Sequence, residues 1–291
     1  MSESSIITNL IGILTTASTL FMVAAGLTLV FGALRLINIA HGSFYMYGAY
    51  LATTLAARLG GAGFWVSLVI CPLVVAAMGV LVEVLVLRRL YRREHLTQLL
   101  ATFALLLIFA DIALRLWGKS VRSIKAPSAL NGHFQFGGAA VPVYDLFVIG
   151  VAALVAIGLW ALMSRSKLGW RVRAVVDDPE VLAASGTNVP LILTGVFALG
   201  AMLAGLSGVV IAPEQAVQPG MDAEIIVAAF IVAVIGGLGS IVGAAIGSLI
   251  IGVVETLGAV WTPSWASTFI YALMILVLAI RPWGLFGETE R

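Results

Sequence analysis

The sequence predicts an all-α protein, a polytopic bundle of transmembrane helices that forms a single domain over residues 1–291. Of these residues, 61% are hydrophobic and 10% are charged, whereas soluble globular domains carry about 25% charged residues. The mean hydropathy is +1.11. Apolar runs of about 18 residues or more recur along the chain, and each is long enough to cross a hydrocarbon core about 30 Å thick.

The apolar runs predict eight or nine membrane segments. They lie at residues 6–33, 43–59, 64–87, 96–117, 142–163, 190–212, 223–238, 241–260 and 265–280. The first run has no Lys or Arg before it, which favours an uncleaved span over a signal peptide. The seventh run is too short to cross the membrane upright, so we expect one short or broken segment.

The distribution of basic residues predicts the orientation. Alternating spans place the stretches 88–94 and 165–173 on one side of the membrane, together with Arg35, Arg281 and Arg291. Cytoplasmic loops of membrane proteins carry an excess of Lys and Arg. We therefore expect the N-terminus outside and the C-terminus in the cytoplasm.

The sequence contains no catalytic constellation. His41, His95 and His133 lie in separate loops, and no zinc-protease or nucleophile-elbow pattern occurs. The chain also lacks a P-loop, so we expect it to have no ATPase site of its own. Cys71 is the single cysteine, which excludes an intrachain disulfide and a cysteine-rich metal site. We expect a chain that is not an enzyme and binds no metal or cofactor itself.

Charged groups inside apolar runs are costly in hydrocarbon and are therefore functional candidates. Asp111 and Arg115 are four residues apart on one predicted helix, which indicates an ion pair. Glu83 is close enough in sequence to reach the arginines at 88–89 or the interface. Glu255 has no basic neighbour in sequence, and two readings stay open for it: exposure at the membrane interface, or a place on a solute pathway.

The densest polar stretch inside an apolar region is FGALRLINIAHGSFYMYGAY, residues 31–50. Helical spacing would place Asn38, His41 and Tyr45 on one face, and Gly42 adds flexibility beside them. Transporters present polar groups to a cavity at membrane depth through broken helices. The alternative is an ordinary cytoplasmic turn between two spans.

A glycine-rich block follows near the end of the chain. Gly239, Gly243 and Gly247 recur every four residues, which predicts close packing between helices. A sharper reading makes Gly236, Gly237 and Gly239 a break between two short helices near the same pathway. Both readings stay open at this point.

A short polar helix is predicted in a cytoplasmic loop at about residues 164–190. It starts with N-cap residues, a proline at the first helical position and an acid in the first turn, and it ends with small residues and a glycine. The residues concerned are Asp177, Asp178, Pro179, Glu180, Ala183, Ala184 and Gly186. Because an isolated helix of about two turns is marginal in water, we expect it to pack against a partner.

Four stretches, in order along the chain, carry a resemblance to one family. They are LINIAHGSFYMYGAY, GWRVRAVVDDPEVLAASGTN, IVAAFIVAVIGGLGSIVGAAIGSLIIGVVE and RPWGLFG. They are similar to LivH-type permeases, the membrane subunits of branched-chain amino-acid ABC importers, and the resemblance covers nearly the whole chain. It implies a multi-pass protein of the bacterial inner membrane that forms a translocation path with a second, LivM-like permease.

The resemblance also implies the other partners. Two ATPase subunits would use ATP and Mg at the cytoplasmic face, and a periplasmic substrate-binding protein would deliver branched-chain or similar small amino acids. In such importers a short cytoplasmic coupling helix docks into each ATPase, and residues 178–186 match that helix. Membrane lipid surrounds the chain, and no nucleic acid is expected.

Two alternatives from other classes stay open. One is a secondary transporter coupled to protons through Asp111, Glu255 or His41, and the other is a passive channel for a small neutral solute such as urea. A capped cytoplasmic helix has no use in either, so the importer permease is the leading interpretation. The solute stays open, because the binding protein sets much of the specificity.

Overall fold

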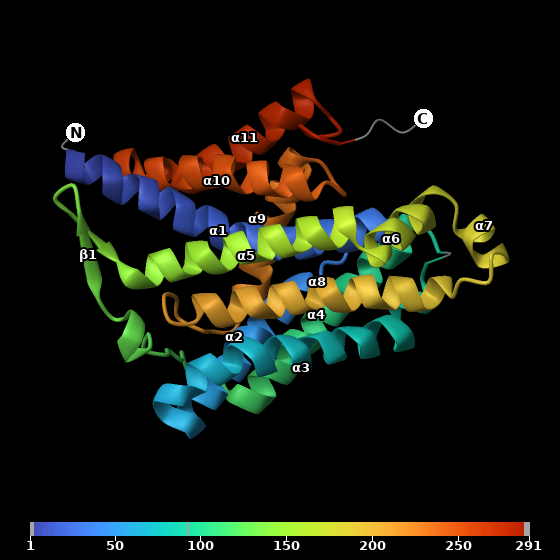
Figure 1. Ribbon diagram of the computed structural model, residues 1–291, viewed down its shortest axis with the longest axis horizontal. Coiled ribbons are helices and arrows are strands. Elements are labelled where there is room, and N and C mark those ends of the chain that lie inside the picture. Colours follow the sequence, from blue (N-terminus) through green and yellow to red (C-terminus); the bar gives the residue numbers. More distant parts are fainter. Residues whose placement is uncertain (1–2, 92, 288–291) are drawn as a thin grey trace.

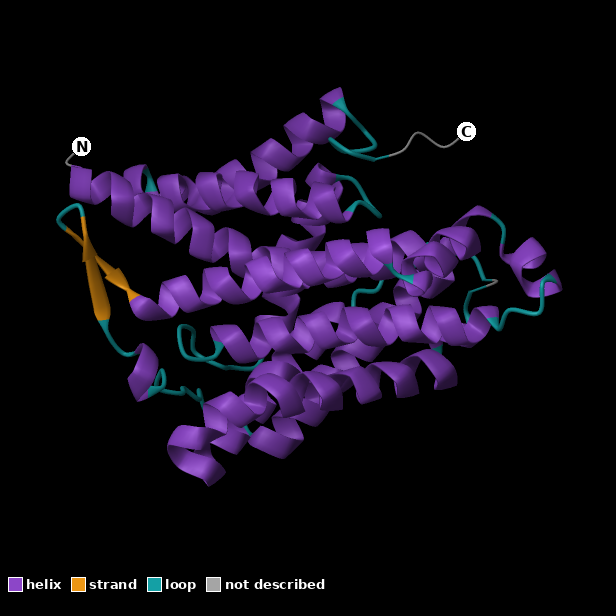
Figure 2. Ribbon diagram, viewed as in Figure 1, coloured by secondary structure: helices purple, strands orange, loops and turns teal. Residues whose placement is uncertain are grey.

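The computed structural model describes residues 3–91 and 93–287 (Figure 1). Arg92 and Arg291, which entered the orientation argument, lie outside the described residues. Helices dominate, which confirms the predicted helical bundle (Figure 2). The long helices are α1 (Glu3–Leu34), α2 (His41–Leu59), α3 (Gly63–Leu85), α4 (His95–Trp117), α5 (Val143–Arg165), α8 (Val189–Ile211), α9 (Met221–Gly236), α10 (Ile241–Trp261) and α11 (Ala266–Ile280).

Short elements join the long helices. The helices α6 (Lys167–Asp177) and α7 (Pro179–Ala184) connect α5 to α8, and a hairpin of β1 (His133–Phe136) and β2 (Ala139–Pro142) precedes α5. Four 3-10 turns complete the description, at Gly60–Ala62, Leu87–Arg89, Ser128–Leu130 and Pro263–Trp265. Figure 1 places α6 and α7 at one end of the bundle, and the hairpin with the start of α1 at the opposite end.

Seven helical stretches among the described residues are long and apolar enough to cross a membrane. One of them, His41–Arg89, joins α2 and α3. The helix α9 has 16 residues, which agrees with the short segment expected there. The prediction of a polytopic helical membrane protein is thus confirmed. The number of membrane crossings and their direction stay predictions.

The hairpin is an addition to the all-α prediction. Phe136 pairs with Ala139 in antiparallel register, so only two residues form the turn. These are Gly137 and Gly138, with φ of 56° and 77°. Two-residue hairpin turns of this kind need positive φ at both central positions, which glycine adopts without steric cost. The Gly-Gly pair was the available signal, but two strands of four residues are easily overlooked beside long apolar runs.

The core lies where α1, α2 and α8 meet. The second half of α1 and the first part of α2 are buried over almost every residue. A Cβ atom on Gly48 of α2 would collide with the carbonyl oxygen of Gly205 in α8, and one on Gly208 would collide with the carbonyl oxygen of Tyr45. Small residues allow such close backbone contact, which stabilises helix association in lipid.

The predicted helical face of residues 38–45 is wrong in one respect. The helix α2 begins only at His41, and the residues between Leu34 and His41 are not helical. Arg35 has a φ of 50°, a left-handed conformation that ends α1 because a side chain cannot continue a right-handed helix from it. Asn38 therefore lies before the helix that carries His41 and Tyr45.

The glycine contact between α2 and α8 generates a stability prediction. Gly208→Ala places a methyl group against the α2 backbone and should lower the free energy of unfolding by about 1–3 kcal/mol, the usual cost of overpacking. The matched control is Gly195→Ala on the same helix, where a Cβ atom meets nothing within 4 Å. The measurement is denaturant unfolding in detergent micelles. Equal effects of the two substitutions would contradict the packing account.

Candidate functional site

The connection between α5 and α8 is built from two capped helices. The hydroxyl oxygen of Ser166 accepts hydrogen bonds from the backbone N–H groups of Leu168 and Gly169 and so caps α6. The Asp178 carboxylate accepts from the N–H groups of Glu180 and Val181, both at 3.0 Å, and caps α7. These bonds satisfy donors that have no partner inside the helix.

The predicted capped helix is therefore confirmed in its local geometry. Pro179 occupies the start of α7, and Gly186, just beyond its end, has a φ of 83°, as a C-terminal glycine requires. Asp177 differs from the expectation, because it is the last residue of α6 and the cap is Asp178 alone.

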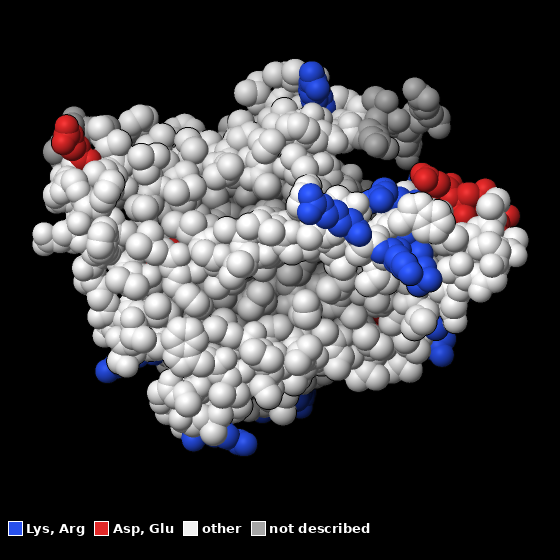
Figure 3. All heavy atoms as spheres, in the orientation of Figure 1, with Lys and Arg blue, Asp and Glu red and all other residues white. Residues whose placement is uncertain are grey.

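The helix α7 presents most of its surface to the surroundings. Leu182 is buried, whereas Val181 is 66% exposed and Ala183 and Ala184 are exposed beside it. Figure 1 shows α7 projecting from the end of the bundle, and Figure 3 shows basic and acidic side chains gathered at that end. The exposed basic residues are Arg165, Lys167, Arg171 and Arg173, and the exposed acids are Asp177, Asp178 and Glu180.

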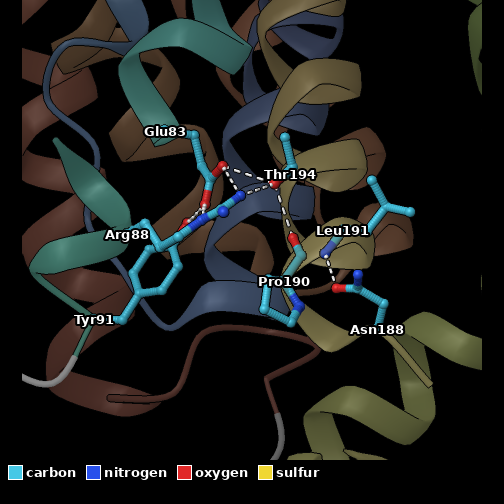
Figure 4. Close-up of polar contacts among 7 residues, drawn as sticks. All are labelled: Glu83, Arg88, Tyr91, Asn188, Pro190, Leu191 and Thr194. Atoms are coloured by element: carbon cyan, nitrogen blue, oxygen red, sulfur yellow. Dashed lines mark hydrogen bonds and ion pairs between the residues drawn. The ribbon is translucent and has the colours of Figure 1, made fainter. Parts of the chain in front are cut away.

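A polar cluster joins α3 to the start of α8 (Figure 4). The buried Glu83 carboxylate accepts hydrogen bonds from Arg88 Nε at 3.2 Å and Nη2 at 3.0 Å. It also accepts from Thr194 Oγ1 at 2.7 Å and from the Tyr91 hydroxyl at 2.8 Å. The sequence left Arg88, Arg89 and the interface open for Glu83, and the structure pairs it with Arg88. The predicted Asp111–Arg115 pair is confirmed at 2.7 Å.

This cluster lies close to the coupling segment along the chain. Asn188 caps α8 through a hydrogen bond from the Leu191 N–H group, and Thr194 follows within the next turn. Thr194 could not be predicted as part of this cluster, since α3 and α8 are far apart along the chain. A buried carboxylate needs several donors to offset its lost hydration, and α8 supplies one of them.

Two predicted pathway residues are buried. Asn38 is 1% exposed, and its side-chain amide forms no hydrogen bond within the described residues. His41 is 0% exposed, and the backbone of Val23 is a polar neighbour of its ring. Gly42 packs against the backbone of Asp222 in α9, and the neighbouring Ser43 hydroxyl donates to the Asp222 carboxylate at 3.2 Å. An unpartnered polar group inside a protein is costly.

Tyr45 lies instead on the wall of a cavity of about 420 Å³. The cavity lies between α1, α2, α9, α10 and the loop that follows α8. Three acidic residues line it, namely Glu214, Glu224 and Glu255. The structure thus brings Tyr45 and Glu255 together, while Asn38, His41, Gly42 and the predicted glycines at 236–239 are not among the lining residues.

The predicted break between α9 and α10 is confirmed. The helix α9 ends at Gly236, and Gly237 and Gly239 have φ of 105° and 92°. The helix α10 begins only at Ile241, so Gly239 precedes it. The expectation that Gly239 lies on one helix face with Gly243 and Gly247 is therefore wrong. Gly236 packs directly on the backbone of Gly243.

The C-terminal segment covers this break, which the sequence did not indicate. The Leu285 N–H group donates to the Ile235 carbonyl at 2.9 Å, and the Phe286 N–H group donates to the Gly236 carbonyl at 3.0 Å. The last carbonyls of a helix lack partners inside it. The RPWGLFG stretch therefore completes the end of α9.

Glu214 lies outside the long helices, in the loop between α8 and α9. Its carboxyl group shares a hydrogen bond with that of Asp145 at the start of α5. Partial burial, followed by the nearby charge of Asp145, raises the pKa of Glu214 to about 7.

Within the described residues, no three His, Cys, Asp or Glu side chains are grouped as ligands for a metal ion.

Known proteins are similar to this sequence over almost the full chain. Residues 9–278 match a family described as "Branched-chain amino acid transport system / permease component". The chain is 32% identical to the high-affinity branched-chain amino acid transport system permease protein BraD of Pseudomonas aeruginosa, over 95% of this chain and 94% of that protein. It is 29% identical to the corresponding permease LivH of Escherichia coli K12, with the same coverage of each chain.

A third relative comes from Methanocaldococcus jannaschii. The chain is 31% identical to the probable branched-chain amino acid transport permease protein LivH of Methanocaldococcus jannaschii, over 92% of this chain and 88% of that protein. No solved structure matches the chain significantly.

The Glu83 cluster predicts non-additive stability effects. Arg88→Met leaves the buried Glu83 carboxylate without its counter-ion and should lower the free energy of unfolding, by less than in a fully buried pair because Arg88 is 39% exposed. Adding Glu83→Gln should restore part of that loss, because the remaining side chain is neutral. The measurement is a double-mutant cycle, in which denaturant unfolding in detergent micelles is compared for the native chain, the two single variants and the double variant. Simple addition of the two single effects would argue against a coupled cluster.

The raised pKa of Glu214 predicts a pH dependence of stability. Since the folded-state pKa of about 7 lies above the ordinary value of 4.5, the contribution of protonated Glu214 is fully present below pH 4.5 and is lost as the pH rises through 7. The stability advantage of the native chain over Glu214→Gln should therefore fall across that window. The change should stay below about 1 kcal/mol because the partly buried Glu214 side chain still reaches solvent, which screens its charge. Unfolding curves across this pH range measure it, and a constant difference would refute the assignment.

Proposed function

The chain belongs to the branched-chain amino-acid transport permease family, and from this premise we propose that it is the membrane-spanning permease subunit of an ATP-driven importer. Its solutes are branched-chain or similar small amino acids. The match over residues 9–278 is the observation that carries this proposal. Nothing in the comparisons favours a proton-coupled carrier or a urea channel.

The proposed importer divides the work among several chains. Two ATPase subunits bind ATP and Mg, a LivM-like sister permease closes the path, and a periplasmic protein delivers the solute. This assignment is supported by the names of the relatives, which describe transport systems with a permease component. The present chain provides part of the path and a docking element for an ATPase.

We propose α7 as that docking element. Its exposed residues include Val181, Ala183 and Ala184, which form a small apolar surface that no other described residue covers, while Leu182 is buried against the neighbouring helices. The short connection from α7 to the capped start of α8 supports mechanical coupling. The cluster around Glu83 then ties α8 to α3, so that a movement of α7 is transmitted to several spans as a rigid-body shift.

The orientation follows from the same assignment. An ATPase works in the cytoplasm, so the end that carries α6 and α7 faces inward, in agreement with its basic residues. The N-terminus then faces outward, the C-terminus lies in the cytoplasm, and the chain crosses the bacterial inner membrane in eight or nine segments. The cavity lined by Tyr45 lies towards the opposite, outer end.

We place the path along the break between α1 and α2. Tyr45 borders the cavity, and Asn38, His41 and Gly42 lie on the chain towards the inward end. The unpartnered side chain of Asn38 is expected where water or solute reaches polar groups in another conformation. Glycines 236, 237 and 239 allow the neighbouring helix to break beside this path.

Reconstituted transport tests the proposed function. The chain is purified with its associated subunits and inserted into liposomes with the cognate binding protein, and uptake of radiolabelled leucine is measured with and without ATP. We expect uptake that requires ATP hydrolysis and is insensitive to a protonophore. Uptake by the permease chain alone, or uptake abolished by the protonophore, would contradict the proposal.

A charge on α7 provides a sharper prediction. Ala184→Arg should reduce ATP-driven uptake by about tenfold or more by weakening ATPase docking, since a charge buried without a partner costs more than 1.4 kcal/mol. Because Ala184 is exposed, the permease should still fold and insert. The control is Ser164→Arg, which adds the same charge at the same end but outside α7. Undiminished uptake by the Ala184 variant would show that α7 is not the docking element.

A further inference from the structure

The charged residues that line the cavity beside Tyr45 are all acidic. Glu214 comes from the loop after α8, Glu224 from the first turn of α9, and Glu255 from α10. No Lys, Arg or His is among the residues that line it. A second cavity of about 100 Å³ shares Glu224, Glu255 and Ser267 with the first. Acidic groups from three separate elements therefore face one continuous hollow without a protein counter-ion.

Tyr45 gives a second and independent indication of a ligand. Its side chain is 2% exposed and lines the cavity. The described residues offer its hydroxyl group no hydrogen-bond partner, although buried tyrosine hydroxyls usually find one. Thr15, on the facing helix α1, likewise has a buried hydroxyl without a partner and lines the same cavity. Two hydroxyl groups are thus available to a bound molecule.

The cavity suits a compact organic molecule better than a metal ion. Its volume of about 420 Å³ lies within the range of small-molecule pockets, about 300–1,000 Å³. The three carboxyl groups are not grouped as the ligands of one ion would be. Leu20, Ile211 and Ile225 contribute apolar surface to the same wall, so acidic, hydroxyl and aliphatic groups meet in one place.

We propose that this cavity binds a compact aliphatic amino acid, with the ammonium group at Glu224 and Glu255 and the carboxylate at the Tyr45 hydroxyl. The inference rests on the proposed function, because it names a solute site on the path of an amino-acid importer. Charge-assisted hydrogen bonds to the carboxylates hold the ammonium group. The Tyr45 hydroxyl donates to the solute carboxylate, and the aliphatic side chain packs on Leu20 and Ile225.

Cysteine accessibility in the assembled importer tests the site. Ser267→Cys places a thiol on the cavity wall, and Ser128→Cys places one on an exposed turn as the matched control. Cys71 is 1% exposed and out of reach. Each thiol reacts with a cationic or an anionic methanethiosulfonate of similar size. We expect the ratio of cationic to anionic rates to be higher at position 267 than at 128, and to fall towards the control value on Glu255→Gln.

Protection of the thiol at position 267 identifies the ligand group. Leucine and 3-methylbutylamine should slow its reaction, whereas 4-methylpentanoate, which lacks the ammonium group, should not. Tyr45→Phe should weaken protection by leucine about tenfold, the loss of one hydrogen bond to a charged group, and leave protection by the amine unchanged. Equal rates with both reagents, or equal protection by the amine and the acid, would overturn the site.

The outcome separates this inference from the proposed function. ATP-driven leucine uptake without any protection at position 267 would refute the cavity as a solute site and leave the importer assignment intact. Protection by ammonium compounds in a chain that transports without an ATPase would refute the importer assignment and leave the site intact. Glu3→Gln, which removes an exposed acid outside the cavity, controls for a general loss of negative charge.

Discussion

The contact between the backbones of α2 and α8 is the constraint on which the rest of the molecule depends. In lipid, apolar side chains gain little from leaving their surroundings, so close backbone packing has to hold the helices together. Gly48, Gly205 and Gly208 bring these two helices together without side chains between them. Because Gly208 lies against the carbonyl oxygen of Tyr45, the same contact holds Tyr45 at the wall of the cavity.

The helix α8 also connects the two regions of interest. Near its start, Thr194 donates to the buried Glu83 carboxylate, and at its end Ile211 lines the acidic cavity. Its 23 residues span about 34 Å at 1.5 Å per residue. A displacement of α7 therefore acts on an element that reaches the cavity directly. The hydrogen bonds at Glu83 therefore tie the start of α8 to α3.

Local patterns in the sequence predicted local structure well. Apolar runs located the long helices of the described residues, and the cap and proline signals located α7. Spacing located the pair at Asp111 and narrowed the partners of Glu83. The failures concern backbone conformation and long-range contact. A positive φ at Arg35 and at Gly239 moved helix starts by a few residues. The cavity was beyond reach because its acids lie in a loop and two helices, far from Tyr45 along the chain. The packing of α1 and α2 against α8, α9 and α10 brings them together.

Cross-linking from α7 tests the central claim most directly. Val181 is 66% exposed, and the single native cysteine is buried, so Val181→Cys can carry a unique photoactivatable cross-linker in native membranes. The account predicts a cross-linked product that contains an ATPase subunit and whose yield changes when ATP is added. A fully labelled chain that cross-links to no ATP-binding protein would contradict it.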